Sequence, residues 1–489
     1  MSEKKATVID ALSVYFSSIF SFVFSFVRGI IVARFLGPTN FGFWKAVELI
    51  QQYHQFSTLG TQNGMSRDIP LYIGKGEEKK AEQIKNLAFS QMFTLPLLVS
   101  LGIFIYSFFA HDTLLAFALR ISSMTVFVGM IYALLFRVLE SYKRFVLVSI
   151  LTITGSIIFF VIDIILVIKF QIYGHLWALL CFQVIMVCLT LFFSKLRFHW
   201  EYSLKQIWGL IKVGFPIMLV GFAFLILTTV DRVLILKFLD LTQLGYYGLG
   251  LMVVGFMQMI PSSIGNVIYP RLNEQYGKHN SFESLERHAL QPQLLLSIIM
   301  AVMLGGGLMF LGDIVKLILP QYQNGVSSAL ILMIGVCVMT ANIFNTINRQ
   351  FIYLSIQVLA ITINLLVSWL LILMGWGIVG VAIGTAVAFI TYKVINAGFT
   401  LWYLKKSFSG SLFYLYQIYF PLIYVVIMVV GFYNLLLPQL VFLTLGSQIA
   451  SKLLFFSLII SPLVVVFIKR AEQIGLNLIV MFRKNGKGA

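Results

Sequence analysis

Long apolar stretches, separated by short polar connections, recur along the whole chain. A helix needs about 20 predominantly apolar residues to cross the hydrocarbon core of a bilayer. The pattern therefore predicts an all-α integral membrane protein with about fourteen transmembrane helices. Their expected positions are near residues 9–34, 41–66, 86–109, 113–137, 144–168, 173–195, 211–237, 244–268, 289–312, 325–347, 352–374, 378–402, 413–436 and 444–468. The second stretch carries the most polar residues.

Lysine and arginine residues concentrate in every second connection, whereas the alternate connections hold few, such as Lys169 and Lys316. Cytoplasmic loops carry an excess of these residues, so we expect both termini in the cytoplasm. Lys79 and Lys484 then lie inside and Lys316 outside. The segment Arg470–Ala489 alternates apolar and basic residues, which favours a helix on the anionic inner leaflet.

Composition supports membrane insertion. The 489 residues are 60% apolar and 11% charged, against about 45–50% and about 25% in soluble domains. The net charge of +17 lies mainly in the connections, which argues against a nucleic-acid partner. Three cysteines occur singly in apolar stretches, so neither a disulfide framework nor a zinc site is expected; they are Cys181, Cys188 and Cys337.

The chain contains an internal repeat. Val27–Trp44 reads VRGIIVARFLGPTNFGFW and Val230–Tyr247 reads VDRVLILKFLDLTQLGYY, at an offset of 203 residues. This offset aligns turn and polar positions as well as apolar ones. The aligned identities are Phe35 with Phe238, Leu36 with Leu239, Thr39 with Thr242, and Gly42 with Gly245.

The repeat predicts two pseudo-symmetric six-helix bundles in tandem, related by an axis along the membrane normal. We expect an N-terminal lobe at 1–205, a second lobe at 206–408, and two further helices with a basic cytoplasmic tail at 409–489. Transporters with such repeats place the substrate near the interface between them.

The sequence resembles a known family. The stretch ARFLGPTNFGFWKAVELI, followed by IGKGEEKKAEQIKN, resembles the polysaccharide-transporter branch of the multidrug/oligosaccharidyl-lipid/polysaccharide (MOP) flippase superfamily. The stretch FPIMLVGFAFLILTTVDRVLILKFL is similar to the seventh helix of that family. The resemblance implies a V-shaped core of twelve helices, two appended helices and alternating access.

Within the family, the chain is most similar to O-antigen-type flippases for undecaprenyl-pyrophosphate-linked repeat units. We therefore expect a flippase in the bacterial inner membrane and not an enzyme. Implied partners are the lipid-linked sugar, membrane lipids, a polysaccharide polymerase and glycosyltransferases. No cofactor is expected, and coupling to H⁺ or Na⁺ is left open. The alternatives are export of lipid II or a teichuronic-type precursor, MATE-like drug or cation antiport, and a sugar-transferring membrane enzyme.

Ionisable side chains inside the predicted spans are the candidate functional groups. Each costs about 2.5–3.5 kcal/mol to insert, so it usually faces a cavity or a partner. With histidine neutral, the positive charges outnumber the negative, which suits an anion such as a pyrophosphate. The residues are Arg28, Lys45, Glu48, His54, Arg120, Asp163, Asp231, Arg232, Lys393 and Lys452.

Arg28 is the first candidate for substrate binding, with Arg232 and Arg120 as further candidates. In the flippases that the chain resembles, an arginine at this place in the first helix lines the central cavity. The repeat aligns Arg28 with Asp231, next to Arg232. The alternative is a structural ion pair between Arg28 and Asp231.

The second span has polar residues on one predicted helical face, at spacings that suit a single stripe. Amides both donate and accept hydrogen bonds, which suits sugar hydroxyls, so we expect the stripe to line the cavity. Hydrogen bonding between helices is the alternative. The stripe consists of Lys45, Glu48, Gln52, Gln55 and Gln62.

A last group of residues is predicted to serve ion coupling or charge pairing. His54 is a candidate proton carrier, although a packing role is the stronger interpretation. Asp163 is either a cation or proton site or the partner of Arg120. The full group is Asp231, Glu48, Asp163, His54 and Lys393.

Overall fold

The computed structural model describes residues 3–279, 282–338, 343, 344, 347, 349–436 and 445–473, and these form helices joined by short connections. The α-helices are α1 (Glu3–His54), α2 (Thr61–Gly74), α3 (Glu78–Gln91), α4 (Leu95–Tyr106), α5 (Thr113–Ser141), α6 (Phe145–Ser194), α7 (Leu204–Phe238), α8 (Leu241–His279), α9 (Phe282–Ile318), α10 (Val326–Cys337), α11 (Gln350–Leu373), α12 (Gly377–Tyr403), α13 (Phe408–Gly431) and α14 (Leu445–Gln473). Two compact units, Met1–Gly248 and Leu249–Ala489, are called the N-terminal and C-terminal units.

Eleven helices in the described part are long and apolar enough to cross a membrane. The predicted all-helical membrane class is confirmed. Two of the eleven are each interrupted by one non-helical residue, Gly37 in α1 and Gln171 in α6. At the first break, Pro38 disfavours a helical conformation for the residue before it, and Gly37 adopts φ 69°.

The second and third predicted spans are interrupted helices and not continuous ones, although Glu78–Tyr106 as a whole is one of the eleven candidate membrane spans. After α1, a 3-10 turn (Gln55–Thr58) leads to Leu59 and Gly60, both with positive φ, before α2 begins. A Cβ on Gly60 would lie 2.5 Å from the backbone of Gly214. Glycine is therefore needed where α2 crosses α7. The third span is likewise divided, by a turn between α3 and α4.

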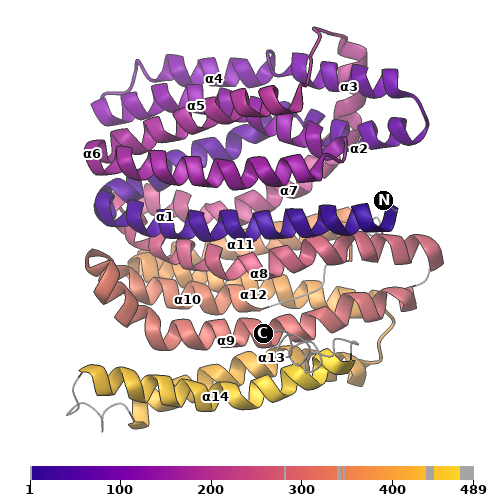
Figure 1. The fold of residues 1–489 in the computed structure, drawn as a ribbon. Coiled ribbons are helices and arrows are strands. Elements are labelled where there is room, and N and C mark those ends of the chain that lie inside the picture. The colour runs from indigo at the N-terminus through magenta and orange to yellow at the C-terminus, as the bar shows by residue number, and fades with distance from the viewer. Residues whose placement is uncertain are drawn as a thin grey trace, which may run out of the picture. The chain divides into compact units, whose positions relative to one another are not determined.

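In the N-terminal unit, α6 lies along α1 on one side and α5 on the other, and α2 packs on α3 and α7 (Figure 1). A buried apolar cluster joins α2, α3 and α5 through Met65, Ala88 and Leu134. This packing fixes the rotation of each helix, and so decides which polar side chains face inward.

Equivalent residues of the sequence repeat touch one another in the N-terminal unit. The hydroxyls of Thr39 and Thr242 lie 2.9 Å apart. A Cβ on Gly42 would lie 1.7 Å from the carbonyl oxygen of Leu241, and one on Gly245 would lie 1.8 Å from that of Pro38. Reciprocal contacts of this kind are the mark of a twofold relation, here between two segments of one chain.

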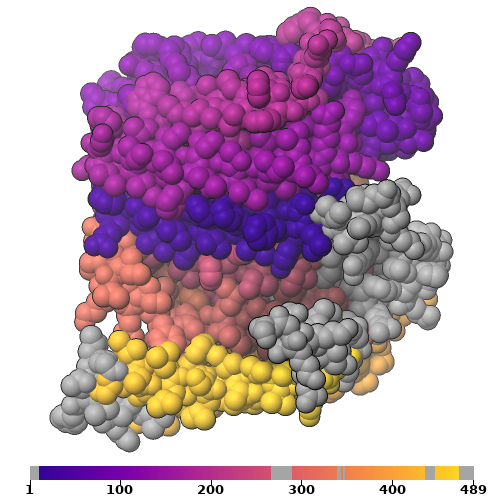
Figure 2. Space-filling model, in the orientation of Figure 1, coloured from indigo at the N-terminus to yellow at the C-terminus, as the bar shows by residue number. Residues whose placement is uncertain are grey.

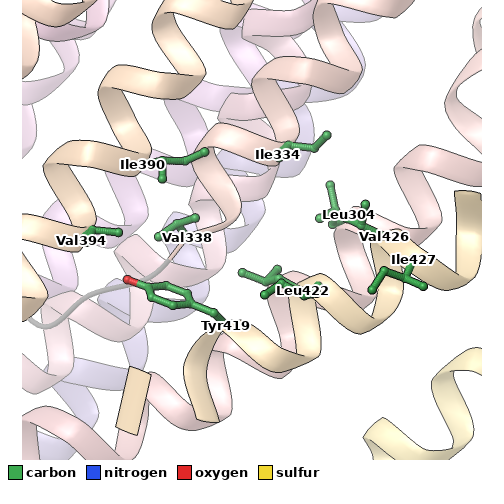
Figure 3. A pocket seen from close by; sticks show the side chains of 10 residues that line it. Leu304, Ile334, Val338, Ile390, Val394, Tyr419, Leu422, Val426 and Ile427 are labelled. Atoms are coloured by element: carbon green, nitrogen blue, oxygen red, sulfur yellow. The ribbon is translucent and has the colours of Figure 1, made fainter. Parts of the chain in front are cut away.

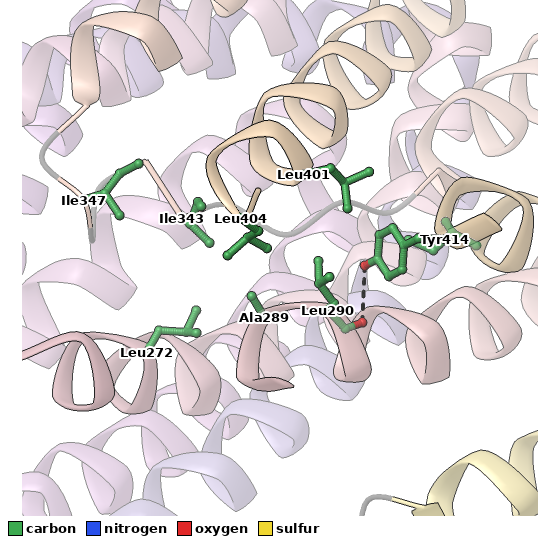
Figure 4. Close-up of a cluster of buried hydrophobic side chains, with 9 residues drawn as sticks. Leu272, Ala289, Leu290, Ile343, Ile347, Leu401, Leu404 and Tyr414 are labelled. Carbon is green, nitrogen blue, oxygen red and sulfur yellow. Dashed lines mark hydrogen bonds between the residues drawn. The ribbon is translucent and has the colours of Figure 1, made fainter. Parts of the chain in front are cut away.

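In the C-terminal unit, α13 and α14 pack on α9, and α12 packs on α10 and α11 (Figure 1). A buried cluster that includes Leu290, Ile343 and Leu401 joins α9, α12 and α13, and the Tyr414 hydroxyl donates to the Leu290 carbonyl at 3.3 Å (Figure 4). The surface of α14, yellow in Figure 2, exposes Leu454. Exposed apolar side chains of this kind suit contact with lipid.

Candidate functional site

A buried charge cluster in the N-terminal unit centres on Asp163. Its side chain is fully buried, and one carboxylate oxygen accepts a hydrogen bond from Arg28 Nη1 at 2.5 Å. The other oxygen lies 2.7 Å from Nδ1 of His175. Each of the two carboxylate oxygens therefore has one partner. These two contacts compensate for the removal of the carboxylate from water.

Local structure brings these residues together. The break at Gln171 divides α6, and Gly174 lets its two parts come close, because a Cβ there would lie 2.0 Å from the Leu166 carbonyl oxygen. His175 thereby reaches Asp163, twelve residues earlier in the chain. The edge of Trp44 packs on the His175 ring, with 4.4 Å between centroids, and so fixes the imidazole.

Arg28 also borders a pocket of about 270 Å³ between α1, α5 and α6. Its guanidinium carbon lies 3.9 Å from the centroid of the Phe159 ring. The lining also contains several hydroxyl side chains, among them Ser21, Ser25 and Thr152, beside apolar ring surface. A charged group and several hydroxyls thus border one cavity inside membrane-spanning helices.

A second charge cluster joins α1 to α7. Lys45 Nζ lies 2.9 Å from the carboxylate of Glu48, and Arg232 Nη1 lies 3.6 Å from the same carboxylate. Nearby, the hydroxyls of Tyr53 and Thr229 are 2.6 Å apart. Part of the polar face of the second predicted span therefore contacts the seventh predicted span, α7. This agrees with the alternative of hydrogen bonding between helices.

Asp231 does not pair with Arg28, so that predicted alternative was wrong. Its carboxylate accepts hydrogen bonds from the Tyr247 hydroxyl at 2.6 Å and from the Arg232 backbone N–H at 2.7 Å. Arg28 instead faces α6. The acidic residues of the two clusters offset their arginines and lysine, so the expected excess of positive charge is not concentrated there.

Arg120 does not pair with Asp163 either, contrary to the second predicted alternative. It is exposed on α5, where its Nε lies 3.4 Å from the Ser107 hydroxyl and its guanidinium carbon lies 4.9 Å from the Phe108 ring centroid. The packing of α6 against α1 instead places Asp163 in contact with Arg28.

His54 lies buried between α1 and α4. Its Nε2 lies 3.3 Å from both the Pro96 carbonyl oxygen and the Ser100 hydroxyl. These contacts agree with the packing interpretation of this residue.

The predicted polar stripe is interrupted. The exposed Gln55 donates its amide to the Gln52 carbonyl at 2.9 Å. Gln62 lies beyond the break at Leu59 and Gly60, on α2, so it does not continue the face formed by the residues of α1. The expectation of a single face over all five residues was wrong because the helix ends at His54.

In the C-terminal unit, Lys393 lies 5.6 Å from the centroid of the Tyr392 ring, and no acidic partner is found for it among the described residues. Lys452 of α14 pairs with Asp313 of α9 at 2.6 Å. This contact ties the last helix to the rest of the unit.

An apolar pocket of about 350 Å³ lies between α9, α10, α12 and α13 (Figure 3). Its walls include Ile334, Val394 and Ile427, and the Tyr419 ring projects into it. The Tyr419 hydroxyl is buried without a hydrogen-bond partner within the described part of the chain.

Sequence reasoning missed three partners: His175, Tyr247 and Asp313. His175 and Asp313 lie near the ends of predicted spans, where a polar residue is commonplace. Tyr247 was aligned with Trp44 by the repeat, and that alignment was an available signal. Both aromatic residues contact a charge-cluster side chain, Trp44 on His175 and Tyr247 on Asp231.

No group of three or more His, Cys, Asp or Glu side chains in the described ranges is arranged to hold a metal ion.

Comparison with known proteins gives a family match and a fold match. The model of a family described as "Polysaccharide biosynthesis protein" matches residues 31–321. No curated protein matches the chain significantly.

Solved structures share the fold at low identity. An inward-facing MATE family multidrug resistance transporter of the MOP superfamily has a TM-score of 0.63 at 15% identity, covering 81% of this chain and 99% of that one. The lipid II flippase MurJ, in an inward closed conformation, has a TM-score of 0.64 at 16% identity, covering 94% and 99%. The Vibrio cholerae MATE transporter VcmN has a TM-score of 0.54 at 14% identity, covering 83% and 97%.

Proposed function

Because the chain belongs to the family of polysaccharide biosynthesis proteins and has the fold of the MOP superfamily, we propose that it is a flippase for a lipid-linked oligosaccharide. It is a multi-pass membrane transporter of polysaccharide biosynthesis, and its family confirms that it is not an enzyme. The proposed substrate is an undecaprenyl-pyrophosphate-linked repeat unit. The flippase carries it from the inner to the outer leaflet by alternating access.

The proposed architecture has fourteen membrane segments in two six-helix lobes, 1–205 and 206–408, with two further helices in 409–489. The breaks at Gly37 and Gln171 support it, because each divides a long helix into two parts that match separate predicted spans. The short α10 matches a further predicted span. The reciprocal contacts of Thr39 with Thr242 support the repeat.

The observation that carries the proposal is Arg28. A charged side chain inside membrane-spanning helices is costly to insert and is retained mainly where it serves function. Here Asp163 holds the guanidinium, and the same guanidinium borders a pocket lined by several hydroxyl groups and by aromatic rings. We propose that Arg28 contacts the head group of the substrate. Arg232, Lys45, Gln52, Gln55 and Arg120 remain predicted contacts.

The hydrocarbon part of the substrate needs an apolar surface. The pocket of Figure 3 has apolar walls apart from Tyr419, which suits a hydrocarbon chain. We propose it as a contact for the lipid part.

The test is translocation in proteoliposomes that contain a fluorescent undecaprenyl-pyrophosphate oligosaccharide. A lectin or glycosidase added outside reports arrival of the sugar in the outer leaflet. We expect movement with the wild-type chain, at least tenfold slower movement with Arg28→Ala, and partial activity with Arg28→Lys, because charge is kept but the guanidinium fork is lost. Liposomes without protein are the control.

The competing functions are separate arms of the same assay. Movement of lipid II but not of the oligosaccharide lipid would assign the chain to a peptidoglycan precursor. Efflux of a cationic dye without either lipid movement would assign it to drug antiport. Either result would overturn the proposed substrate.

A further inference from the structure

The pocket beside Arg28 contains more hydrogen-bonding groups than the protein itself uses. Arg28 donates through Nη1 to Asp163, whereas its Nε and Nη2 have no acceptor among the described residues. Its side chain is 19% exposed, so it is not sealed inside the protein. A guanidinium has five N–H donors in a fixed plane. The donors of Arg28 that do not bond to Asp163 are available for a ligand in the pocket.

Hydroxyl groups along α1 show the same surplus. Ser17 and Ser18 donate to the Val14 carbonyl at 3.0 and 2.7 Å, which is the usual way a helix satisfies a serine. Ser21 and Ser25, which border the pocket, have no hydrogen-bond partner in the part of the chain that the structure describes. Their spacing to Arg28 places all three on one face of α1.

The opposite wall adds further polar groups. Thr152 and Ser156 of α6 donate their hydroxyl hydrogens to backbone carbonyls at 2.8 and 2.7 Å, so only their oxygen lone pairs remain as acceptors. Tyr132 of α5 borders the pocket, and its hydroxyl has no partner among the described residues. The pocket therefore presents donors from Arg28 and both donors and acceptors from hydroxyls.

Two aromatic rings complete the lining. Phe159 and Phe182 are stacked, with 4.6 Å between centroids and 21° between planes, and both border the pocket. A sugar ring has hydroxyls at its edge and apolar C–H groups on its faces. Arg28 and Phe182 cover the two faces of Phe159, so the aromatic contribution is the remaining ring surface that borders the pocket, and together with the hydroxyl partners it matches both features.

Size and charge narrow the ligand further. The volume of about 270 Å³ lies just below the range of about 300–1,000 Å³ typical of small-molecule pockets, so it holds about one sugar ring and not a whole repeat unit. The positive charge of Arg28 is offset by Asp163 at 2.5 Å. A neutral sugar therefore fits better than a pyrophosphate, which brings several negative charges.

We propose that the pocket between α1, α5 and α6 is a subsite for one neutral sugar ring of the lipid-linked substrate. Arg28, Ser21, Ser25 and Tyr132 supply its hydrogen bonds. This proposal rests on the proposed function, because it specifies which part of the lipid-linked substrate the pocket binds. It places the pyrophosphate outside this pocket.

The experiment measures binding by the full chain in nanodiscs, with saturation-transfer NMR. The probes are neutral methyl glycosides of glucose, galactose and N-acetylglucosamine, with methyl glucuronide and inorganic pyrophosphate as competitors. The variants are Ser21→Ala with Ser25→Ala, and Tyr132→Phe, which removes one hydroxyl at nearly constant volume. Ser18→Ala is the matched control, because that hydroxyl is on the same helix but bonds to Val14.

We expect at least one neutral glycoside to bind, and to bind about tenfold more weakly to the double serine variant, with Ser18→Ala unchanged. Equal affinity in the double variant, stronger binding of the glucuronide, or displacement by pyrophosphate would each overturn the subsite. Translocation by a chain that binds no glycoside would overturn the subsite and leave the flippase standing. Glycoside binding by a chain that does not translocate the lipid-linked oligosaccharide would overturn the flippase and leave the sugar subsite standing.

Discussion

At the scale of single residues, ion-pair partners decide what each charged side chain does. Arg28 and His175 hold the two oxygens of Asp163. Asp231, aligned with Arg28 by the repeat, is held by Tyr247. The two repeats therefore carry charge at equivalent positions but stabilise it by different partners.

Removal of Arg28 should destabilise the protein because it leaves a buried carboxylate with one partner fewer. Breaking a buried pair costs about 3–5 kcal/mol, and we expect the lower end because His175 remains. Arg28→Ala with Asp163→Asn should recover much of this loss, since the two residues are in contact. Thermal unfolding in detergent measures the effect.

The matched control is Arg28→Ala combined with Asp231→Ala. That combination should recover nothing, because Asp231 does not touch Arg28. Recovery with Asp231→Ala and not with Asp163→Asn would show that the ion pair between Arg28 of α1 and Asp163 of α6 is not the one that stabilises the protein.

A second prediction at this scale concerns energy coupling. If a proton or sodium gradient drives transport, we expect Asp163→Asn to abolish the dependence of transport on that gradient, because this residue offers a buried carboxylate. His54→Gln should keep the dependence, since His54 is held by Ser100 and Pro96. Uptake with and without an imposed gradient distinguishes them, and gradient dependence that survives in Asp163→Asn would exclude this carboxylate.

At the scale of helices, close backbone contacts position the charged groups. Gly42 and Gly245 let the segment after Gly37 approach the start of α8, and Gly60 lets α2 approach α7. These contacts set the depth at which Glu48 meets Arg232. Small residues commonly permit such approach between membrane helices.

Gly245→Ala should therefore lower the amount of folded protein, because the added Cβ would lie 1.8 Å from the Pro38 carbonyl oxygen. Overpacking typically costs about 1–3 kcal/mol, and a clash with backbone belongs at the upper end. Gly255→Ala on the same helix is the control, since a Cβ there meets nothing within 4 Å. Fluorescence-detected gel filtration of both variants gives the comparison, and equal yields would contradict the contact.

At the scale of the whole molecule, orientation follows from where basic residues lie. Lys79 and Lys316 are both exposed, so access to a reagent depends on the side of the membrane. An impermeant amine reagent applied to intact cells should modify Lys316 and not Lys79. Lys484, expected inside as well, lies outside the described residues. Labelling of Lys79 in intact cells would reverse the predicted topology.

The sequence by itself determined the membrane class, the approximate position of most helices and the repeat. Each of these depends on local properties: the length of apolar stretches, the placement of lysine and arginine, and residue identity at a fixed offset. The ends of α5, α11 and α12 lie close to their predicted positions for this reason. The intramembrane charges were also visible, because a charged residue in an apolar stretch needs no structure to be recognised.

Only the tertiary structure decided which charges meet. Three acidic residues within the predicted spans were candidate partners of Arg28. The packing of α1 on α6 brings Asp163 into contact with it. The break at Leu59 and Gly60 removes Gln62 from its predicted face. Which charged residues form an ion pair depends on the rotation and depth of each helix against its neighbours, and on backbone breaks that allow helices to cross closely. Packing between residues far apart in the chain sets the rotation, the depth and the crossings.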